Sequence, residues 1–341
     1  MRQISARRVL LALGVACGVS LMAGTTFAAE KIKFSLDWKY EGPASPFLLA
    51  LDNGYFADEG LEVTIDTGNG SSGAITRVGS GAYDISMADL NSLVEFNVKN
   101  PDRALKAFFV IYNYPPFSLF TMKKSGINEP KDFEGKTLGA PVFDSPRKLF
   151  PAFAKSTGID MSTVTWESMD PPLREPMLMR GEVDAISGFY FTSLLNLESQ
   201  GVKREDLKIF NYIDYGMAFY GNGLIASPAL LEKPDVLKGF AKAVVKGFSD
   251  AIKDPAGAIV ALKKRDPLID PELEQERLQM ALDMCVQTDE VAENGMGPIK
   301  KDRMAKAIEQ LAVAFELPTT PTVDDIFTNA AMPEKADRML P

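Results

Sequence analysis

The chain has 341 residues, a formal net charge of −9 and no histidine. Such an acidic protein lacks the positive field that binds nucleic acid. Without imidazole it also lacks the group on which triad hydrolases, most zinc sites and most neutral-pH acid–base enzymes depend. The composition therefore predicts a protein that is not an enzyme and that uses no metal or other cofactor.

Residues 1–28 have the features of a cleaved signal peptide. Three arginines precede an apolar run over residues 9–22, and small residues before the end at Ala28 suit a signal peptidase. The apolar run is shorter than the roughly 20 residues of a membrane-spanning helix, which argues against an uncleaved anchor. Cleavage removes three arginines and no acidic residue, so the formal charge of the exported chain falls from −9 to −12.

The exported chain holds a single cysteine and is long enough for two domains. Cys17 leaves with the signal peptide, so no intrachain disulfide can form. Cys285 lies in an apolar stretch that predicts a buried helical thiol with a structural role. More than 300 residues exceed what one hydrophobic core normally organises.

Residues 31–65 predict a β-α-β unit. Residues 32–38 alternate apolar and polar side chains as a strand does, and residues 61–65 begin a second strand of the same pattern. Between them, Ser45 is placed to cap a helix whose first position is Pro46. The unit predicts an α/β fold with mostly parallel sheets covered by helices.

The end of the first strand is the first candidate site. Ligands of parallel α/β sheets bind beyond the carboxyl ends of the strands. Asp37, Trp38 and the loop to Pro46 lie at such an end. The same pattern continues with a glycine-rich loop over residues 68–73, a short helix over 74–78 and a strand over 83–87. A helix over 90–98 and a strand over 107–112 follow, and residues 113–116 lead out of the first lobe.

From about Leu119 the pattern starts again. Ser145-Pro146 repeats Ser45-Pro46 one hundred residues later, and residues 181–185 repeat residues 81–85. We therefore predict a second, similar lobe. Residues 212–215 should cross back to the first lobe, and the rest of the chain should be mainly helical. The strands expected in this half lie within residues 132–140, which also contain a turn, and around residues 164–166, 183–186 and 207–210. The expected helices begin at residue 144, run over residues 172–180 and 237–252, begin again at residues 254–255, and include residues 304–315.

At this point the chain resembles the periplasmic substrate-binding proteins of ABC importers. It is most similar to the branch that contains the thiamine-pyrimidine, sulfonate, taurine and nitrate binders. The residues that carry the resemblance are 36–38, 50–63, 68–73, 81–85, 132–139 and 181–185.

The resemblance implies a type II periplasmic binding protein of two lobes joined by two crossover segments. Each lobe would be a mostly parallel sheet flanked by helices, with residues 29–118 and 215–341 in one lobe and 119–214 in the other. A small-molecule ligand would be trapped between the lobes of a periplasmic monomer and delivered to an ABC permease with its ATPase. A sensor in place of the permease stays open as an alternative.

Aromatic residues at strand ends suggest a flat ligand held between rings. Trp38 and Trp166, the only tryptophans, end one predicted strand in each lobe, and Phe143, Phe189 and Tyr190 end strands in the second lobe. Each of them alone could equally pack in a core. Together at equivalent positions they predict a cleft lined by aromatic side chains.

The polar candidates point to two different ligands. Asp37, Asp89 and Asp144 suit a ligand rich in N–H donors, although each could merely cap a helix. The helix start at Ser71 and Ser72 can bind an acceptor or an anion through free N–H groups. Arg147 opposes the macrodipole in the first turn of its helix, so it suits an anion as well.

We expect a thiamine-precursor pyrimidine, or a similar planar heteroaromatic, as the ligand. A sulfonate, taurine, nitrate or an aromatic carboxylate is the alternative. The G-x-G-x-x-G pattern over residues 68–73 also allows a dinucleotide site, but it follows the second strand of its unit, not the first. An enzyme like the pyrimidine synthases is not expected, since the histidine and cysteine-rich motif that the resemblance would require are absent.

Overall fold

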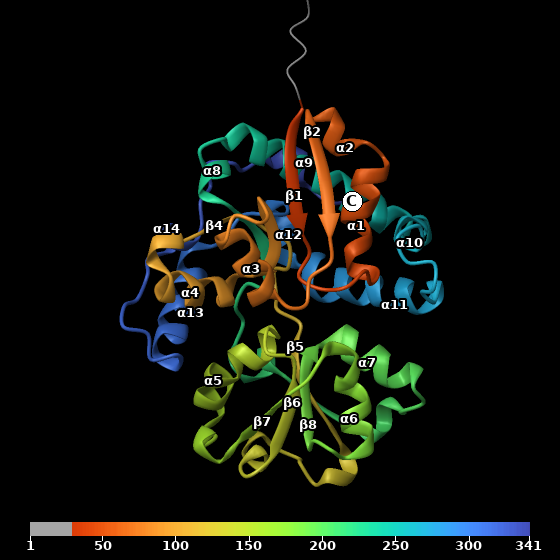
Figure 1. Ribbon diagram of the computed structural model, residues 1–341, viewed down its shortest axis with the longest axis vertical. Helices are drawn as coiled ribbons and strands as arrows, with labels where there is room; N and C mark the ends of the chain where they lie inside the picture. Colours follow the sequence, from red (N-terminus) through yellow and green to blue (C-terminus); the bar gives the residue numbers. More distant parts are fainter. Residues whose placement is uncertain (1–28) are drawn as a thin grey trace, which may run out of the picture.

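The computed structural model describes residues 29–341, so the predicted signal peptide lies outside the described residues. These residues form two lobes, one above the other in Figure 1, each built around a five-stranded sheet. The strand orders are β2-β1-β3-β10-β4 in the first lobe and β7-β6-β8-β5-β9 in the second. This confirms the predicted α/β class and the two-lobed periplasmic binding protein fold.

The first lobe contains the N-terminal β-α-β unit and one strand from much later in the chain. Its elements are β1 (Glu30–Ser35), α1 (Ser45–Asp52), α2 (Tyr55–Asp58), β2 (Leu61–Asp66), α3 (Ser71–Gly79), β3 (Ile85–Asp89), α4 (Leu90–Lys99), β4 (Lys106–Val110) and β10 (Asn222–Ala226).

The second lobe repeats this arrangement with a separate set of elements. They are β5 (Phe117–Met122), β6 (Thr137–Ala140), α5 (Ser145–Thr157), β7 (Thr165–Ser168), α6 (Arg174–Arg180), β8 (Ala185–Phe189), α7 (Tyr190–Ser199) and β9 (Leu207–Asn211).

The C-terminal part is helical and covers the first lobe. It comprises α8 (Pro228–Leu231), α9 (Pro234–Lys253), α10 (Pro255–Lys263), α11 (Pro271–Ala281), a π-helical turn (Leu282–Val286), α12 (Asp289–Asn294), α13 (Lys301–Ala314) and α14 (Val323–Ile326). Cys285 is buried in the π-helical turn, as predicted, and burial raises the pKa of its thiol. Within residues 29–341, no helix is both long enough and apolar enough to cross a bilayer.

One strand in each sheet runs against the others. β10 pairs antiparallel with β3 and β4, and β5 pairs antiparallel with β8 and β9, whereas β1 with β2 and β6 with β7 are parallel. Both reversed strands come directly after a crossing between lobes. Each crossing segment delivers the chain to the side of the sheet where the carboxyl ends of the parallel strands lie. A strand that starts from that side must run antiparallel to them. β10 was not predicted, because the chain after the second crossing was expected to be mainly helical.

The core of the first lobe joins the N-terminal unit to the C-terminal helices. The Phe34 ring of β1 lies 5.3 Å from the rings of both Phe47 and Phe240, and Phe47 lies 5.4 Å from Phe248. All four side chains are buried, so the predicted apolar stripe of α9 covers the first strand and α1. The start of α1 differs from the prediction. Ser45 does not cap the helix but is its first residue, and its hydroxyl donates to the Gly42 carbonyl at 2.6 Å because a 3₁₀ turn precedes it.

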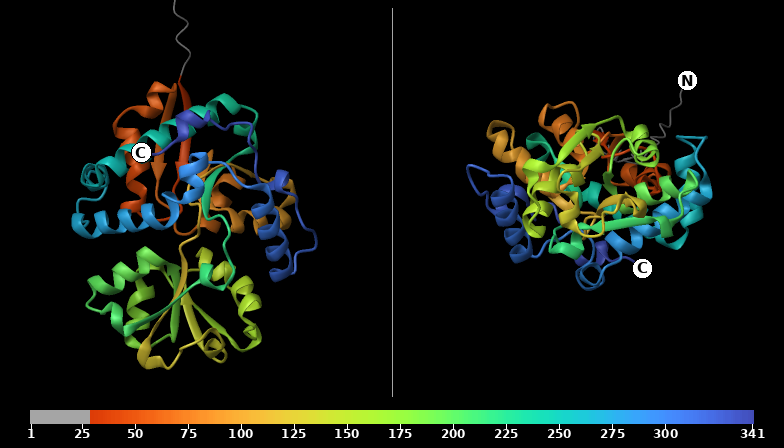
Figure 2. Two further views of the ribbon diagram at one scale, coloured as in Figure 1. Left: turned by 180° about the vertical axis from the view of Figure 1, so that it is seen from behind. Right: turned by 90° about the horizontal axis from the view of Figure 1, so that it is seen from below.

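Two crossing segments, residues 111–116 and 212–221, join the lobes, as Figure 2 shows from behind. Arg303 of α13 holds them together. Its guanidinium donates to the Asn113 carbonyl at 2.6 Å in the first segment and to the Phe219 carbonyl at 2.7 Å in the second. The same group lies over the ring of Tyr220, 4.0 Å from its centroid. One partly buried cation thus joins both connections between the lobes.

Candidate functional site

A cavity lies between the lobes at the carboxyl ends of the parallel strands. The first lobe contributes the loop after β1, the start of α3 and Tyr112 at the first crossing. The second lobe contributes the starts of α5, α6 and α7. The residues on which the argument below depends are Asp37, Trp38, Glu41, Gly70, Ser71, Tyr112, Asp144, Ser145, Arg174, Phe189, Phe191 and Thr192.

Five of the eleven residues predicted from the sequence line this cavity. They are Asp37, Trp38, Ser71, Asp144 and Phe189. Asp144 also caps α5, accepting from the Arg147 backbone N–H at 3.2 Å, and receives a hydrogen bond from the Ser187 hydroxyl at 2.7 Å. It therefore serves the local structure and faces the cavity at once.

Three predicted residues have structural partners away from the cavity. Asp89 caps α4, where it accepts from the backbone N–H and the hydroxyl of Ser92, each at 2.7 Å, and burial raises its pKa to about 6. The Arg147 guanidinium donates to the Ala140 carbonyl at 2.8 Å and lies over the Trp166 ring at 5.1 Å. Trp166 lies in β7, the edge strand of its sheet, where Arg147 covers its ring. The expected pair of tryptophans across the cleft therefore does not form.

The other three predicted residues also lie outside the cavity lining. Ser72 follows Ser71 in α3 but does not reach the cavity. Tyr190 packs against Phe120, 6.3 Å between ring centroids, and the Phe143 side chain is 41% exposed. A role of these residues in ligand binding stays a prediction to which the geometry adds no support.

Asp37 is the most perturbed acid of the cavity. Its carboxylate accepts from the Asn222 side-chain amide at 2.6 Å, and burial raises its pKa to about 7, with the nearby carboxylates of Glu41 and Asp89 adding to the rise. No cation among the described residues pairs with it in the structure. At neutral pH this group can donate or accept a proton, which suits a ligand with both N–H donors and ring nitrogens.

The raised pKa of Asp37 predicts a pH dependence of stability. A carboxyl with a folded pKa of about 7 and an ordinary value of 3.8 binds more protons in the folded than in the unfolded state between these values. The free energy of unfolding should therefore fall as the pH rises through this range and level off above pH 7. Asp89, whose pKa is about 6, contributes to the decrease in the free energy of unfolding only up to about pH 6. Asp37→Asn should therefore abolish the decrease between pH 6 and pH 7.

Urea unfolding at pH 5, 6, 7 and 8 measures this effect. Asp206→Asn, at an exposed position, controls for the change of charge. Parallel pH curves for the wild type and Asp37→Asn would contradict the assignment.

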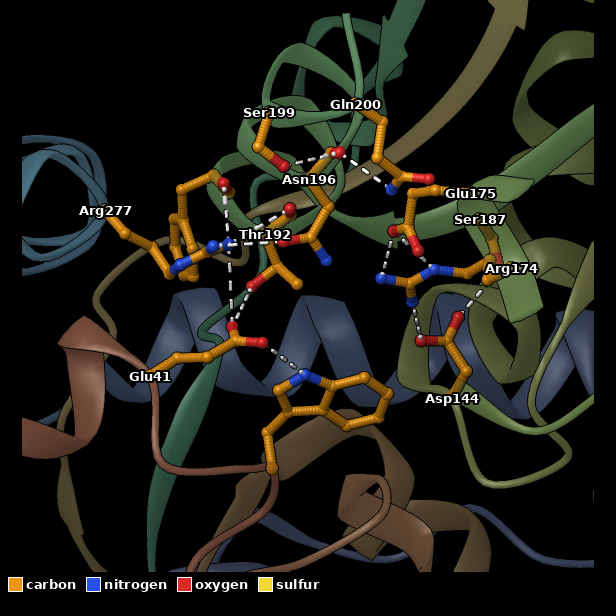
Figure 3. Close-up of polar contacts among 12 residues, drawn as sticks. Glu41, Asp144, Arg174, Glu175, Ser187, Thr192, Asn196, Ser199, Gln200 and Arg277 are labelled. Carbon is orange, nitrogen blue, oxygen red and sulfur yellow. Dashed lines mark hydrogen bonds and ion pairs between the residues drawn. The ribbon is translucent and has the colours of Figure 1, made fainter. Parts of the chain in front are cut away.

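Glu41 joins the two lobes through partners from both, as Figure 3 shows. Its carboxylate accepts from the Trp38 indole N–H at 3.2 Å in its own lobe and from the Thr192 hydroxyl at 2.9 Å in the other lobe. The guanidinium of Arg277 in α11 lies 3.6 Å from the same carboxylate. Separation of the lobes would break the bond from Thr192 and so change the surroundings of Trp38, which shares the Glu41 carboxylate.

Arg277 extends this contact into the second lobe. Its guanidinium donates to the Thr192 carbonyl and to the Asn196 side chain, both at 3.0 Å (Figure 3). It also forms an ion pair with Glu274 at 3.0 Å. The Arg277 side chain is 1% exposed. We call Glu41, Thr192, Asn196, Glu274 and Arg277 the interlobe latch.

Arg174 covers the aromatic wall of the cavity from the second lobe. Its guanidinium lies 5.5 Å from the centroid of the Trp38 ring, and its charge is met by Glu175 at 2.8 Å and Asp144 at 3.4 Å (Figure 3). The Arg174 side chain is 2% exposed. Because two carboxylates already neutralise it, Arg174 offers little free positive charge to a ligand.

The lobes approach each other closely at Gly70. A Cβ atom at this position would lie 2.2 Å from the carbonyl oxygen of Phe143 in the other lobe, and the backbone φ of +135° favours glycine. The N-terminal ends of α3 and α5 therefore meet across the cleft.

Sequence reasoning missed Glu41, Tyr112, Phe191, Thr192 and Arg277 as cavity or latch residues. Glu41 alone carried a usable signal, because it lies in the loop that the β-α-β pattern had already assigned to the site. Arg277 is one charged residue in a charged helix, and nothing in its neighbourhood in sequence distinguishes it from a solvated side chain.

The fold and the cavity define the class of protein: a two-lobed chain of the periplasmic binding protein fold, with its cavity between the lobes. In structure the chain is similar to the alkanesulfonate-binding protein of Xanthomonas axonopodis bound to MOPS, with a TM-score of 0.69, 15% identity, and coverage of 88% of this chain and 99% of the other. This similarity shows the fold alone.

The chain belongs to the NMT1/THI5-like family, whose model matches residues 43–258. It is 28% identical over 281 residues to the formylaminopyrimidine-binding protein of Halalkalibacterium halodurans, covering 80% of each chain. It is also 29% identical over 238 residues to the 4-amino-5-hydroxymethyl-2-methylpyrimidine phosphate synthase of Schizosaccharomyces pombe, covering 67% of each chain. The family resemblance stated from the sequence is thereby confirmed.

The synthase relative corrects the prediction that this chain is not an enzyme. That prediction was based on the absence of histidine and of a cysteine-rich motif. A relative named as a synthase shares two thirds of the chain at 29% identity, so this family includes enzymes as well as binding proteins. The prediction was wrong because it relied on residue types that the chain lacks. The chemistry of a site depends on the side chains that are present there.

Proposed function

We propose that this protein captures a small planar heteroaromatic ligand, specifically a thiamine-precursor pyrimidine, in the cavity between its lobes. In this proposal the protein is exported to the periplasm, acts as a monomer, and delivers the ligand to an ABC permease with its ATPase. The relative that binds formylaminopyrimidine supports the ligand class.

The observation that carries the proposal is the Asp37 carboxyl, which lies beside Trp38 and has no cation partner among the described residues. An aminopyrimidine presents an amino N–H donor and a ring nitrogen acceptor side by side. A carboxyl with a pKa near 7 can accept from the first and donate to the second. The Trp38 and Phe189 rings in the same cavity supply apolar surface for the flat face of such a ligand.

The charges of the cavity favour a pyrimidine over an anion. Asp37, Glu41 and Asp144 line the cavity, while Arg174 is already neutralised by Asp144 and Glu175. Arg147, the cation that a sulfonate or nitrate would need, lies outside the lining. Lys39, the lining cation that has no carboxylate partner among the described residues, is solvent-exposed, so an anionic ligand would gain little in return for the hydration that it loses.

Calorimetry with the purified protein tests the proposal. Formylaminopyrimidine, 4-amino-5-hydroxymethyl-2-methylpyrimidine, an alkanesulfonate, taurine and nitrate form the panel. We expect heat of binding from the pyrimidines and none from the anions. Binding of an alkanesulfonate with no response to either pyrimidine would overturn the ligand assignment and leave the fold and family as they are.

Trp38→Ala should weaken pyrimidine binding at least tenfold, or about 1.4 kcal/mol, because the ring forms a wall of the cavity. Trp166→Ala is the matched control. It removes the other tryptophan, which packs against Phe150 at 5.4 Å and does not line the cavity. Titration of both variants by calorimetry should show the loss in Trp38→Ala only, and equal affinities in the two variants would contradict a stacking role for Trp38.

A further inference from the structure

Two serines at the starts of helices meet at the cavity, one from each lobe. Ser71 is the first residue of the nine-residue helix α3, and Ser145 is the first residue of the thirteen-residue helix α5. Both line the cavity, and they are only 1% and 2% exposed. The close approach of Gly70 to Phe143 brings the two helix starts together across the cleft.

Neither hydroxyl has a hydrogen-bond partner among the described residues. A buried polar group without a partner costs on the order of 1–3 kcal/mol, so proteins rarely retain one without a reason. Ser187 and Ser92 show the usual arrangement, since they donate to Asp144 and Asp89. Ser86 and Ser193 are also unpaired, but they do not line the cavity. The unpaired hydroxyls of Ser71 and Ser145 are therefore available to a ligand in the cavity.

Both helix starts provide donors, although α5 has fewer free N–H groups, because Pro146 has none and Arg147 donates its own to Asp144. The first N–H groups of a helix have no partner within the helix, and a serine hydroxyl can add one more donor. This subsite therefore suits a hydrogen-bond acceptor. Arg277 and Arg174 already pair with Glu41 and Asp144, and Lys39, the lining cation without a carboxylate partner among the described residues, is exposed. The cavity therefore offers a negatively charged acceptor little compensation, which favours an uncharged one.

We propose that Ser71 and Ser145 form a subsite for an uncharged carbonyl oxygen of the ligand. A carbonyl oxygen has two lone pairs and can accept from both hydroxyls at once, whereas a ring nitrogen has only one. Because the serines belong to different lobes, the oxygen is held by both only when the lobes are closed. This inference rests on the proposed function and specifies it further: the ligand carries an N–H-rich edge for Asp37 and a carbonyl group for the two serines.

Calorimetry with two probes tests the subsite. Formylaminopyrimidine carries the carbonyl group, and its deformylated amine does not. Ser71→Ala and Ser145→Ala should each weaken formylaminopyrimidine binding by about five- to tenfold and change binding of the amine by less than twofold. Each variant should be at least as stable as the wild type in urea, since it removes an unpaired buried hydroxyl.

Ser193→Ala is the matched control, because Ser193 also has a buried hydroxyl without a partner but does not line the cavity. Its affinity for both probes should equal that of the wild type. If Ser71→Ala and Ser145→Ala behave like Ser193→Ala while Trp38→Ala loses affinity, the subsite is wrong and the proposed function stands. If the wild type binds neither pyrimidine, both fail. Serine-dependent binding of an alkanesulfonate would overturn the uncharged acceptor.

Discussion

Gly70→Ala should reduce ligand affinity at least a hundredfold, about 2.8 kcal/mol. The added Cβ would lie 2.2 Å from the Phe143 carbonyl oxygen, so the lobes could not reach the closed arrangement without displacing backbone. Separation at this point would also draw Thr192 away from Glu41 and Ser145 away from Ser71. Calorimetry measures the affinity, and small-angle scattering should show no ligand-dependent compaction in the variant.

Gly81→Ala separates this steric effect from local backbone strain. Gly81 lies in the same lobe with a φ of +77°, and an added Cβ would meet nothing within 4 Å. Both variants should lose on the order of 1–3 kcal/mol of unfolding free energy because alanine resists positive φ. Only Gly70→Ala should lose binding. Equal affinities in the two variants would show that the contact between Gly70 and Phe143 does not limit closure.

Arg277→Met should lower the free energy of unfolding by about 3–5 kcal/mol. Methionine preserves most of the side-chain volume but removes the charge, which leaves Glu274 and Glu41 largely buried without a cation. Burial already raises the pKa of Glu274 with Arg277 in place. Without the arginine the pKa should rise further, so the loss of stability should be larger at pH 8 than at pH 5.

Arg204→Met is the control for a surface ion pair. Arg204 bonds Glu198 through two nitrogens, at 2.8 and 3.0 Å, but its side chain is 52% exposed. We expect a loss of at most about 1 kcal/mol there. Urea unfolding followed by circular dichroism compares the two variants. A loss in Arg277→Met no larger than in Arg204→Met would mean that the interlobe latch adds nothing to stability.

The sequence predicted the elements with strong local patterns and the residues that the loop after β1 contributes to the cavity. The alternation in residues 32–38 placed Asp37 and Trp38 at the end of a strand, and both line the cavity. Asp144 was predicted as a helix cap or a cleft residue, and it is both. These predictions succeeded because strand ends and helix starts are local features.

The sequence failed where position depends on contacts between distant segments. Trp166 ends a strand as predicted, but that strand, β7, lies at the edge of its sheet and carries the ring away from the cavity. Arg277 reaches the cleft only because α11 packs beside α7. Neither helix has a sequence pattern that predicts this contact. The unpaired hydroxyls of Ser71 and Ser145 are likewise visible only once the two helix starts have been brought together.

The clamp at Arg303 determines how this molecule can move. Since one guanidinium binds carbonyls in both crossing segments, neither segment can shift along the other without breaking those hydrogen bonds. We therefore expect the lobes to open by rotation about these segments and not by sliding past one another. In such a rotation the approach of Gly70 to Phe143, the hydrogen bond from Thr192 to Glu41 and the separation of the two serines would change together.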